Sequence, residues 1–186
     1  MVQHSILTKL PISIYKDILK KYRLEESNVL FDNDTHEHAK ALISELAKSA
    51  KDNGLIQIHS TVFCNTIFDS LEVKEALRDA STRGVRLEVK TIATKDKLGA
   101  AINTYSNIFM DNFKLTENVK IFDAQNEQLN NFMVVDKTGL RYEQELYPLE
   151  NMQECHNQPR PNMNAIACFN DIENAGALSS FFEKQQ

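Results

Sequence analysis

The chain has 186 residues, 42% of them hydrophobic and 25% charged, and a formal net charge of −5. These values fit one globular domain, and no apolar run reaches the roughly 20 residues that a membrane span needs, so we expect no membrane partner. The negative charge weighs against a surface built to neutralise phosphates, so nucleic acid is not the favoured partner. The N-terminus lacks a signal-peptide pattern, and Cys64, Cys155 and Cys168 are widely spaced, which predicts reduced thiols in a cytoplasmic protein of a bacterium or phage.

The N-terminal part of the chain predicts two helices. Apolar residues recur every four positions over residues 11–22, which we assign to an N-terminal helical extension of residues 1–28. The main predicted domain takes up residues 29–186. Its first element is an amphipathic helix over residues 39–50, which follows four candidate N-caps in residues 32–35.

The next unit predicts a strand, a helix and a second strand. Residues 55–59 are short and apolar, residues 71–80 carry apolar side chains at helical spacing, and residues 85–92 predict a strand again. Such a unit implies a parallel pair of strands. A further helix over residues 98–109 and a strand over residues 119–122 follow.

The pattern then changes to antiparallel structure. Residues 132–136 and 140–144 flank Lys137-Thr138-Gly139, which suits a tight hairpin. Residues 146–163 contain three prolines and predict a long loop. Residues 164–169 predict a closing strand, after which a last helix begins.

The predicted fold class is therefore α/β, with a mixed β-sheet sandwiched between helices. Four apolar residues lie in central strands or on apolar helix faces, namely Leu77, Val89, Val134 and Ile166. We expect all four to be buried, so that truncation of any of them would leave a cavity.

Three stretches resemble one half of the phospholipase D superfamily, namely residues 80–85 (Ala-Ser-Thr-Arg-Gly-Val), 131–139 and 164–182. That family places its chemistry in His-x-Lys-x-x-x-x-Asp, in which the His is the nucleophile and the Lys binds phosphate. Counting back from Asp136, Leu129 stands at the His position and Asn131 at the Lys position. The resemblance therefore implies a phospholipase D-like domain with a degenerate motif, in which hydrolysis through a phosphohistidine is not expected.

The candidate binding residues surround this motif, and they are His59, Asn131, Arg141, Glu143 and Glu145. His59 ends a predicted central strand, where open α/β sheets bind ligands, although a polar residue that simply closes a strand is the plainer interpretation. Glu143 and Glu145 alternate on one strand and would face the same side. They could hold a cation, act as acid and base, or form the solvent face of an edge strand.

Two other groups of titratable residues could carry chemistry. His36 and His38 are two residues apart on a predicted helix, so we interpret them as part of a capped, solvated helix start rather than a metal site. Cys155 and His156 are adjacent in the long loop, and we interpret them as surface residues. The sequence predicts no metal site and no cofactor.

The leading functional hypothesis is a catalytically degenerate phospholipase D-like module that binds a protein partner or a phosphate-bearing ligand. One alternative is an enzyme with relocated chemistry around His59, Glu143 and Glu145. Another is a nucleic-acid-binding accessory factor. Active members of the family bring two halves together, so a single half also implies a homodimer, in which Arg141 would separate the glutamates of the two chains.

Overall fold

The computed structural model describes residues 9–60, 65–91, 119–123, 131–143 and 164–184. Several predicted features lie outside these ranges: the helix over 98–109, the loop over 146–163, Cys64, Leu129, Glu145, Cys155 and His156. In the described part of the chain, no helix is both long and apolar enough to cross a membrane.

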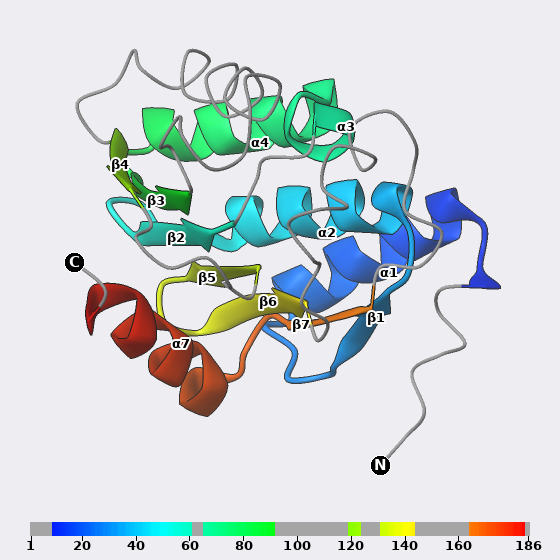
Figure 1. Ribbon diagram of the computed structural model, residues 1–186. Helices are drawn as coiled ribbons and strands as arrows, with labels where there is room; N and C mark the ends of the chain where they lie inside the picture. The colour runs from blue at the N-terminus through cyan, green and yellow to red at the C-terminus, as the bar shows by residue number, and fades with distance from the viewer. Residues whose placement is uncertain (1–8, 61–64, 92–118, 124–130, 144–163, 185–186) are drawn as a thin grey trace.

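The described strands form one mixed sheet of seven, in the order β1-β7-β6-β5-β2-β3-β4 (Figure 1). Strands β2, β3 and β4 are parallel, and the other neighbours pair antiparallel. The predicted α/β class with a mixed sheet is confirmed. The strands are β1 (Phe31–Asn33), β2 (Leu55–His59), β3 (Arg86–Thr91), β4 (Val119–Asp123), β5 (Phe132–Val135), β6 (Gly139–Glu143) and β7 (Ala165–Cys168).

Helices cover the sheet on both faces (Figure 1). Helices α2 and α4 lie on one face, with α1 packed against α2, and α7 lies on the other. The described helices are α1 (Ile12–Leu24), α2 (His36–Ser49), α3 (Asn65–Phe68), α4 (Leu71–Thr82) and α7 (Ile172–Lys184). We call these two sides of the sheet the α2 face and the α7 face.

Side chains alternate between the two faces along each strand. On β2, Ile56 and Ile58 belong to the large core on the α2 face, whereas Gln57 accepts a hydrogen bond from Ser179 of α7 at 2.7 Å. On β5, Met133 belongs to the large core and Val134 to the smaller cluster under α7. This alternation decides which of the candidate site residues can meet.

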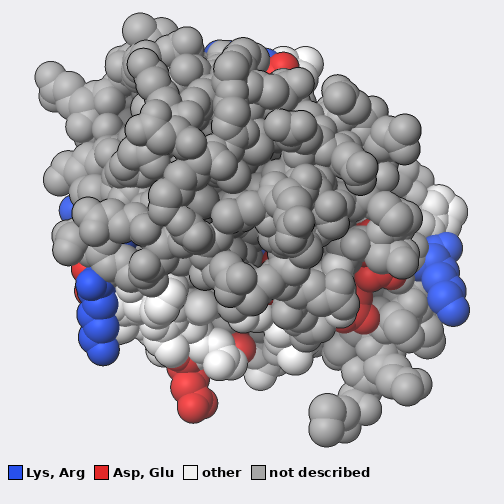
Figure 2. Space-filling model, in the orientation of Figure 1, with Lys and Arg blue, Asp and Glu red and all other residues white. Residues whose placement is uncertain are grey.

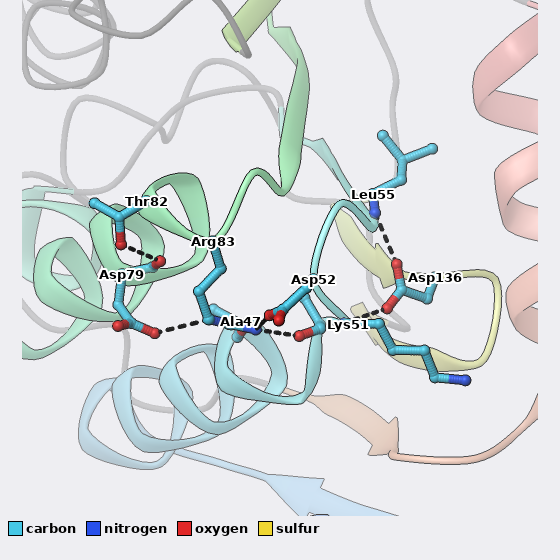
Figure 3. Close-up of polar contacts among 9 residues, drawn as sticks. Ala47, Lys51, Asp52, Leu55, Asp79, Thr82, Arg83 and Asp136 are labelled. Carbon is cyan, nitrogen blue, oxygen red and sulfur yellow. Dashed lines mark hydrogen bonds and ion pairs between the residues drawn. The ribbon is translucent and has the colours of Figure 1, made fainter.

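A carboxylate holds the hairpin between β5 and β6 against the start of β2 (Figure 3). Asp136 accepts the backbone N–H groups of Lys51 and Leu55, both at 2.7 Å. Asp136 and Lys137 both have positive φ, at 51° and 57°, as the central residues of a type I′ turn do. A Cβ on Gly54 would lie 2.3 Å from the Asp136 carboxylate, so only glycine fits there.

Arg83 ties the end of α4 to the end of α2 (Figure 3). Its guanidinium donates to the carbonyl of Ala47 at 3.3 Å and to that of Ala50, and it pairs with Asp79 at 3.1 Å. Ala47 lies in the last turn of α2 and Ala50 is its C-cap, so Arg83 donates to carbonyl groups at a helix end, where the helix itself supplies fewer N–H donors. The Arg-Gly-Val stretch that resembles the family therefore has a structural role here.

The N-terminal part of the chain contains the predicted helix, an unpredicted strand and one of the candidate N-caps. Helix α1 lies in the predicted extension, and its Tyr15 and Leu19 are fully buried in the large core. Strand β1 was not predicted, because it has three residues and pairs only with the distant β7. Thr35 is the N-cap of α2, since its hydroxyl accepts the N–H of His38 at 3.2 Å.

Three of the four predicted core residues are buried, with Leu77 and Val134 1% exposed and Val89 fully buried. The prediction for Ile166 is wrong, because this residue is only partly buried. It lies on the α7 face of β7, beside Tyr142 of β6. No described helix covers that part of the sheet (Figure 1).

Candidate binding site at one end of the sheet

Three strand ends bring a polar network together on the α2 face. Arg141 of β6 donates from Nε to the Asn33 side-chain oxygen at 2.9 Å and from Nη2 to Glu143 at 3.0 Å. Asn131, just before β5, donates from Nδ2 to the other Glu143 oxygen at 2.7 Å. The network forms because the end of β1, the start of β5 and the end of β6 lie side by side at the same end of the sheet.

The ion pair at the centre of this network is buried. The side chains of Arg141 and Glu143 are 5% and 10% exposed. Removal of either charge would destabilise the fold, because the remaining charge would be buried without a partner. The interpretation of Glu143 as the solvent face of an edge strand is therefore wrong, since β6 lies between β5 and β7.

Aromatic and imidazole side chains of α1 and α2 lie beside the network. The Tyr15 hydroxyl donates to the Asp32 carbonyl at 3.2 Å, and its ring contacts that of His38 at 4.4 Å between centroids. Burial raises the pKa of Tyr15, against the opposing effect of Arg141, so the phenol stays protonated. Burial also lowers the pKa of His38, so its imidazole is neutral near pH 7.

The histidines at the start of α2 are not solvated as predicted. His36 and His38 are each 5% exposed. Nδ1 of His38 has no hydrogen-bond partner among the described residues. The described residues contain no group of three His, Cys, Asp or Glu side chains that could hold a metal ion. Cys168 is also buried, which raises the pKa of its thiol.

His59 lies on the opposite side of the sheet from this network. It is fully buried on the α7 face, where its ring stacks on Phe132 at 4.7 Å and also contacts Phe181 and Phe182 of α7. Asn131, Arg141 and Glu143 are brought together, and His59 is separated from them by the sheet. The structure therefore does not unite His59 with Glu143, as relocated chemistry would require.

A buried lysine beside His59 was missed by the sequence analysis. Lys90 of β3 is the register partner of His59 and is 1% exposed. Its ammonium donates to the Phe182 carbonyl near the end of α7 and lies 4.4 Å from the Phe182 ring centroid. Burial lowers the pKa of Lys90. The sequence places Lys90 on a polar strand face with Arg86 and Glu88, and gives no sign that α7 covers it.

No protein-family model matches this chain, and no curated protein matches it by sequence. Solved structures do match its fold. Nuc, a phospholipase D family member from Salmonella typhimurium, superposes with a TM-score of 0.59 at 14% identity, over 84% of this chain and 93% of Nuc.

Two longer proteins contain a similar domain. The archaeal chromatin protein TrmBL2 matches with a TM-score of 0.51 at 10% identity, over 92% of this chain and 58% of its own length. The phosphatidylserine synthase of Haemophilus influenzae Rd KW20 matches with a TM-score of 0.50 at 15% identity, over 86% of this chain and 38% of its own length. At such low identities these likenesses define the fold alone, and that fold is phospholipase D-like.

Proposed function

We propose that this chain is a catalytically degenerate phospholipase D-like module that binds a protein partner through the polar end of its sheet. The observation that carries the proposal is the hydrogen bond between Asn131 and Glu143. Asn131 stands where the resembling motif has its phosphate-binding lysine, and it donates to Glu143 at 2.7 Å. A lysine-sized cation is thus replaced by an amide that is held by a carboxylate.

The charges of the network favour a protein over a phosphate-bearing ligand. Its single cation, Arg141, is already paired with Glu143. A phosphate entering here would meet a carboxylate before any free cation, and two anions in one buried site repel each other. A protein surface instead offers neutral backbone and amide groups, which can hydrogen-bond to a network whose one cation and one carboxylate are already paired.

The same geometry disfavours an enzyme with relocated chemistry. A general base must lie within hydrogen-bond reach of the group that it serves. The rings of Phe132, Phe181 and Phe182 contact His59, and Glu143, the predicted acid that the structure describes, faces the other side of the sheet.

The proposal has two tests on purified protein. The first is an assay for turnover of a generic phosphodiester, DNA, RNA and phosphatidylcholine, in which we expect none. Turnover that disappears in His59→Ala would overturn the proposal. The second is affinity purification from the native host with wild-type, Asn131→Arg and Asn28→Arg proteins as bait.

Asn28 is a matched control, because it is an exposed asparagine in the loop before β1, at the opposite end of the sheet from Asn33. We expect a protein that is retained by wild-type chain and by Asn28→Arg, and that is lost with Asn131→Arg. Equal retention by all three baits would place the interaction elsewhere on the molecule.

A nucleic-acid-binding accessory role is the second candidate, and the likeness to TrmBL2 favours it. That protein is described as a chromatin protein with a novel mode of DNA binding. The net charge of −5 is the main argument against the same role here. Binding to phosphates releases counterions, so an affinity for DNA or RNA that falls steeply with salt would support this candidate over the first.

A further inference from the structure

The α7 face of the sheet is covered over only part of its width. Helix α7 packs on β2, β5 and β6 through buried Ala175, Ser179 and Phe182, and no described helix lies over β7 and β1 on this face (Figure 1). A groove of about 410 Å³ runs between α7 and these strands. Its apolar lining comes from Leu30, Leu140, Tyr142, Ile166, Ala177 and Leu178.

The floor of the groove consists of apolar side chains that the fold leaves incompletely covered. Tyr142 and Ile166 are register partners on β6 and β7, and both are only partly buried. Leu30, just before β1, is 43% exposed. Adjacent apolar residues on one sheet face normally have a layer packed on them. No described element supplies such a layer over Ile166, which is why its side chain is only partly buried.

One side of α7 forms the wall of the groove. Asn174, Ala177, Leu178 and Phe181 recur at intervals of three and four residues, so they lie along one stripe of the helix. Phe181 is 45% exposed, and Ala177 is exposed too. Short side chains at 174 and 177 would let a second helix approach to the usual separation of about 8–10 Å.

The charged groups at the groove are acidic. Asp171 lines it at the start of α7, and none of its lining residues is a lysine or arginine. Asp32 pairs with Ile166 across β1 and β7 and alternates with Asn33, which faces Arg141, so Asp32 lies on the groove side. In Figure 2, the described surface at the lower left, where Figure 1 draws α7, is mainly uncharged, with both acidic and basic side chains protruding from it.

We propose that this groove docks an amphipathic helix of a partner protein, whose apolar face is flanked by lysine and arginine. The apolar floor and wall would receive the apolar face, and Asp32 and Asp171 would pair with the flanking cations. A helix fits better than a small molecule, because a groove whose floor residue Leu30 is 43% exposed is an open trough, whereas small-molecule sites enclose most of their ligand. The proposal goes beyond the binding proposed for the polar network, which lies on the other face.

The test uses ¹⁵N-labelled full-length chain and two synthetic helical peptides with the same leucine face, one flanked by lysine and one by glutamate. We expect the lysine-flanked peptide to shift the amide signals of Leu30, Tyr142, Ile166 and Leu178, and to bind more tightly than the glutamate-flanked peptide. Asp32→Lys should reverse that order of affinity, while keeping the Asp32 carbonyl that Tyr15 uses.

A matched pair of leucine substitutions locates the site. Leu30→Glu should weaken binding of the lysine-flanked peptide about tenfold, which corresponds to the loss of one well-packed contact. Leu71→Glu is the control, since Leu71 is 66% exposed at the start of α4, outside the groove. Melting curves of both variants verify that they are folded.

Three results would overturn the proposal. One is equal affinity of the two peptides for wild-type chain, and another is no shift of the groove amides at millimolar peptide. The third is a shift confined to the free edge of β1, which would indicate an added strand instead of a docked helix. None of these results bears on the Asn131→Arg experiment, so the two proposals can fail separately.

Discussion

Asp136 is the residue from which the sequence resemblance was counted, and its carboxylate accepts hydrogen bonds from two backbone N–H groups. Because each oxygen accepts an N–H group at 2.7 Å, we expect Asp136→Asn to lower the free energy of unfolding by about 1–3 kcal/mol. An amide at this position offers one acceptor and turns a donor toward the second N–H. Urea unfolding measures the change. Asp17→Asn, at an exposed position of α1, should change stability by less than about 0.5 kcal/mol.

Glu143 is the residue on which the polar network depends. We expect Glu143→Gln to cost about 3–5 kcal/mol of unfolding free energy, because it leaves the buried Arg141 guanidinium without a counter-charge. The exposed Glu75 supplies the matched Glu→Gln control on α4. Replacement of both Arg141 and Glu143 by methionine should recover most of the loss. If Glu143→Gln unfolds at the same urea concentration as wild type, the ion pair has no role in stability.

We expect His38 to make folding sensitive to mild acid. Burial lowers the pKa of His38 in the folded chain below its ordinary value of 6.5, so the unfolded chain binds the proton more readily. Stability from this residue is therefore present above pH 6.5 and is lost as the pH falls toward the lower folded-state pKa. His38→Phe keeps a ring against Tyr15 and removes the titration.

Thermal melting between pH 7 and 5 tests this expectation, with a smaller decline of Tm in His38→Phe than in wild type. Carboxylates with a lowered pKa, such as Glu45, lose their contribution only below their ordinary pKa of 4.5, and so in a separate window. Parallel declines in both proteins would show that His38 is not the sensitive group.

At the scale of elements, α1 contributes more to the core than its prediction as an N-terminal extension suggests. Leu19 is fully buried in the core that α1 shares with α2, so Leu19→Ala should cost about 2–5 kcal/mol. Leu24, 67% exposed at the end of the same helix, gives the matched control, whose truncation should be nearly neutral. Equal effects at the two positions would mean that α1 does not pack on α2.

Elements with strong local signals were predicted well. The hairpin of β5 and β6 follows from the turn predicted at residues 137–139, which the structure places one residue earlier, at 136–138. The parallel pair of β2 and β3 follows from a strand, a helix and a strand in succession. Strand β1 was missed because its three residues include an aspartate and an asparagine, and it is a strand only through pairing with β7.

The candidate site could be predicted only in part, because it is made of contacts between distant residues. The sequence indicated Asn131, Arg141 and Glu143, but the bond between Arg141 and Asn33 spans 108 positions and leaves no local trace. The same holds for Lys90, whose partner Phe182 is 92 positions away. His59 was grouped with the wrong residues, since only the strand register decides which face each side chain occupies.

On the scale of the whole molecule, the two surfaces that we propose for partners lie on opposite faces of the sheet. The polar network lies at the ends of β1, β5 and β6 on the α2 face, and the apolar groove lies beside α7 on the other. A homodimer predicted from the resemblance would use the first of these surfaces. Arg141 was expected to separate the glutamates of the two chains in that dimer. In the structure it already pairs with Glu143 of its own chain. Arg141→Glu would therefore disrupt the fold before it tested association.

Asn131→Arg is the better probe of the homodimer, since Asn131 is only partly buried at the edge of the network. A two-fold axis at this surface would bring both copies of residue 131 together, and two added arginines would then repel each other. We expect light scattering at tens of micromolar to give twice the 21.3 kDa mass of the chain for wild type and for Asn28→Arg, and a smaller mass for Asn131→Arg. That concentration is well above a Kd of roughly 1 μM, which corresponds to about −8 kcal/mol. A wild-type mass of one chain would exclude the homodimer and leave the polar end of the sheet to a different protein.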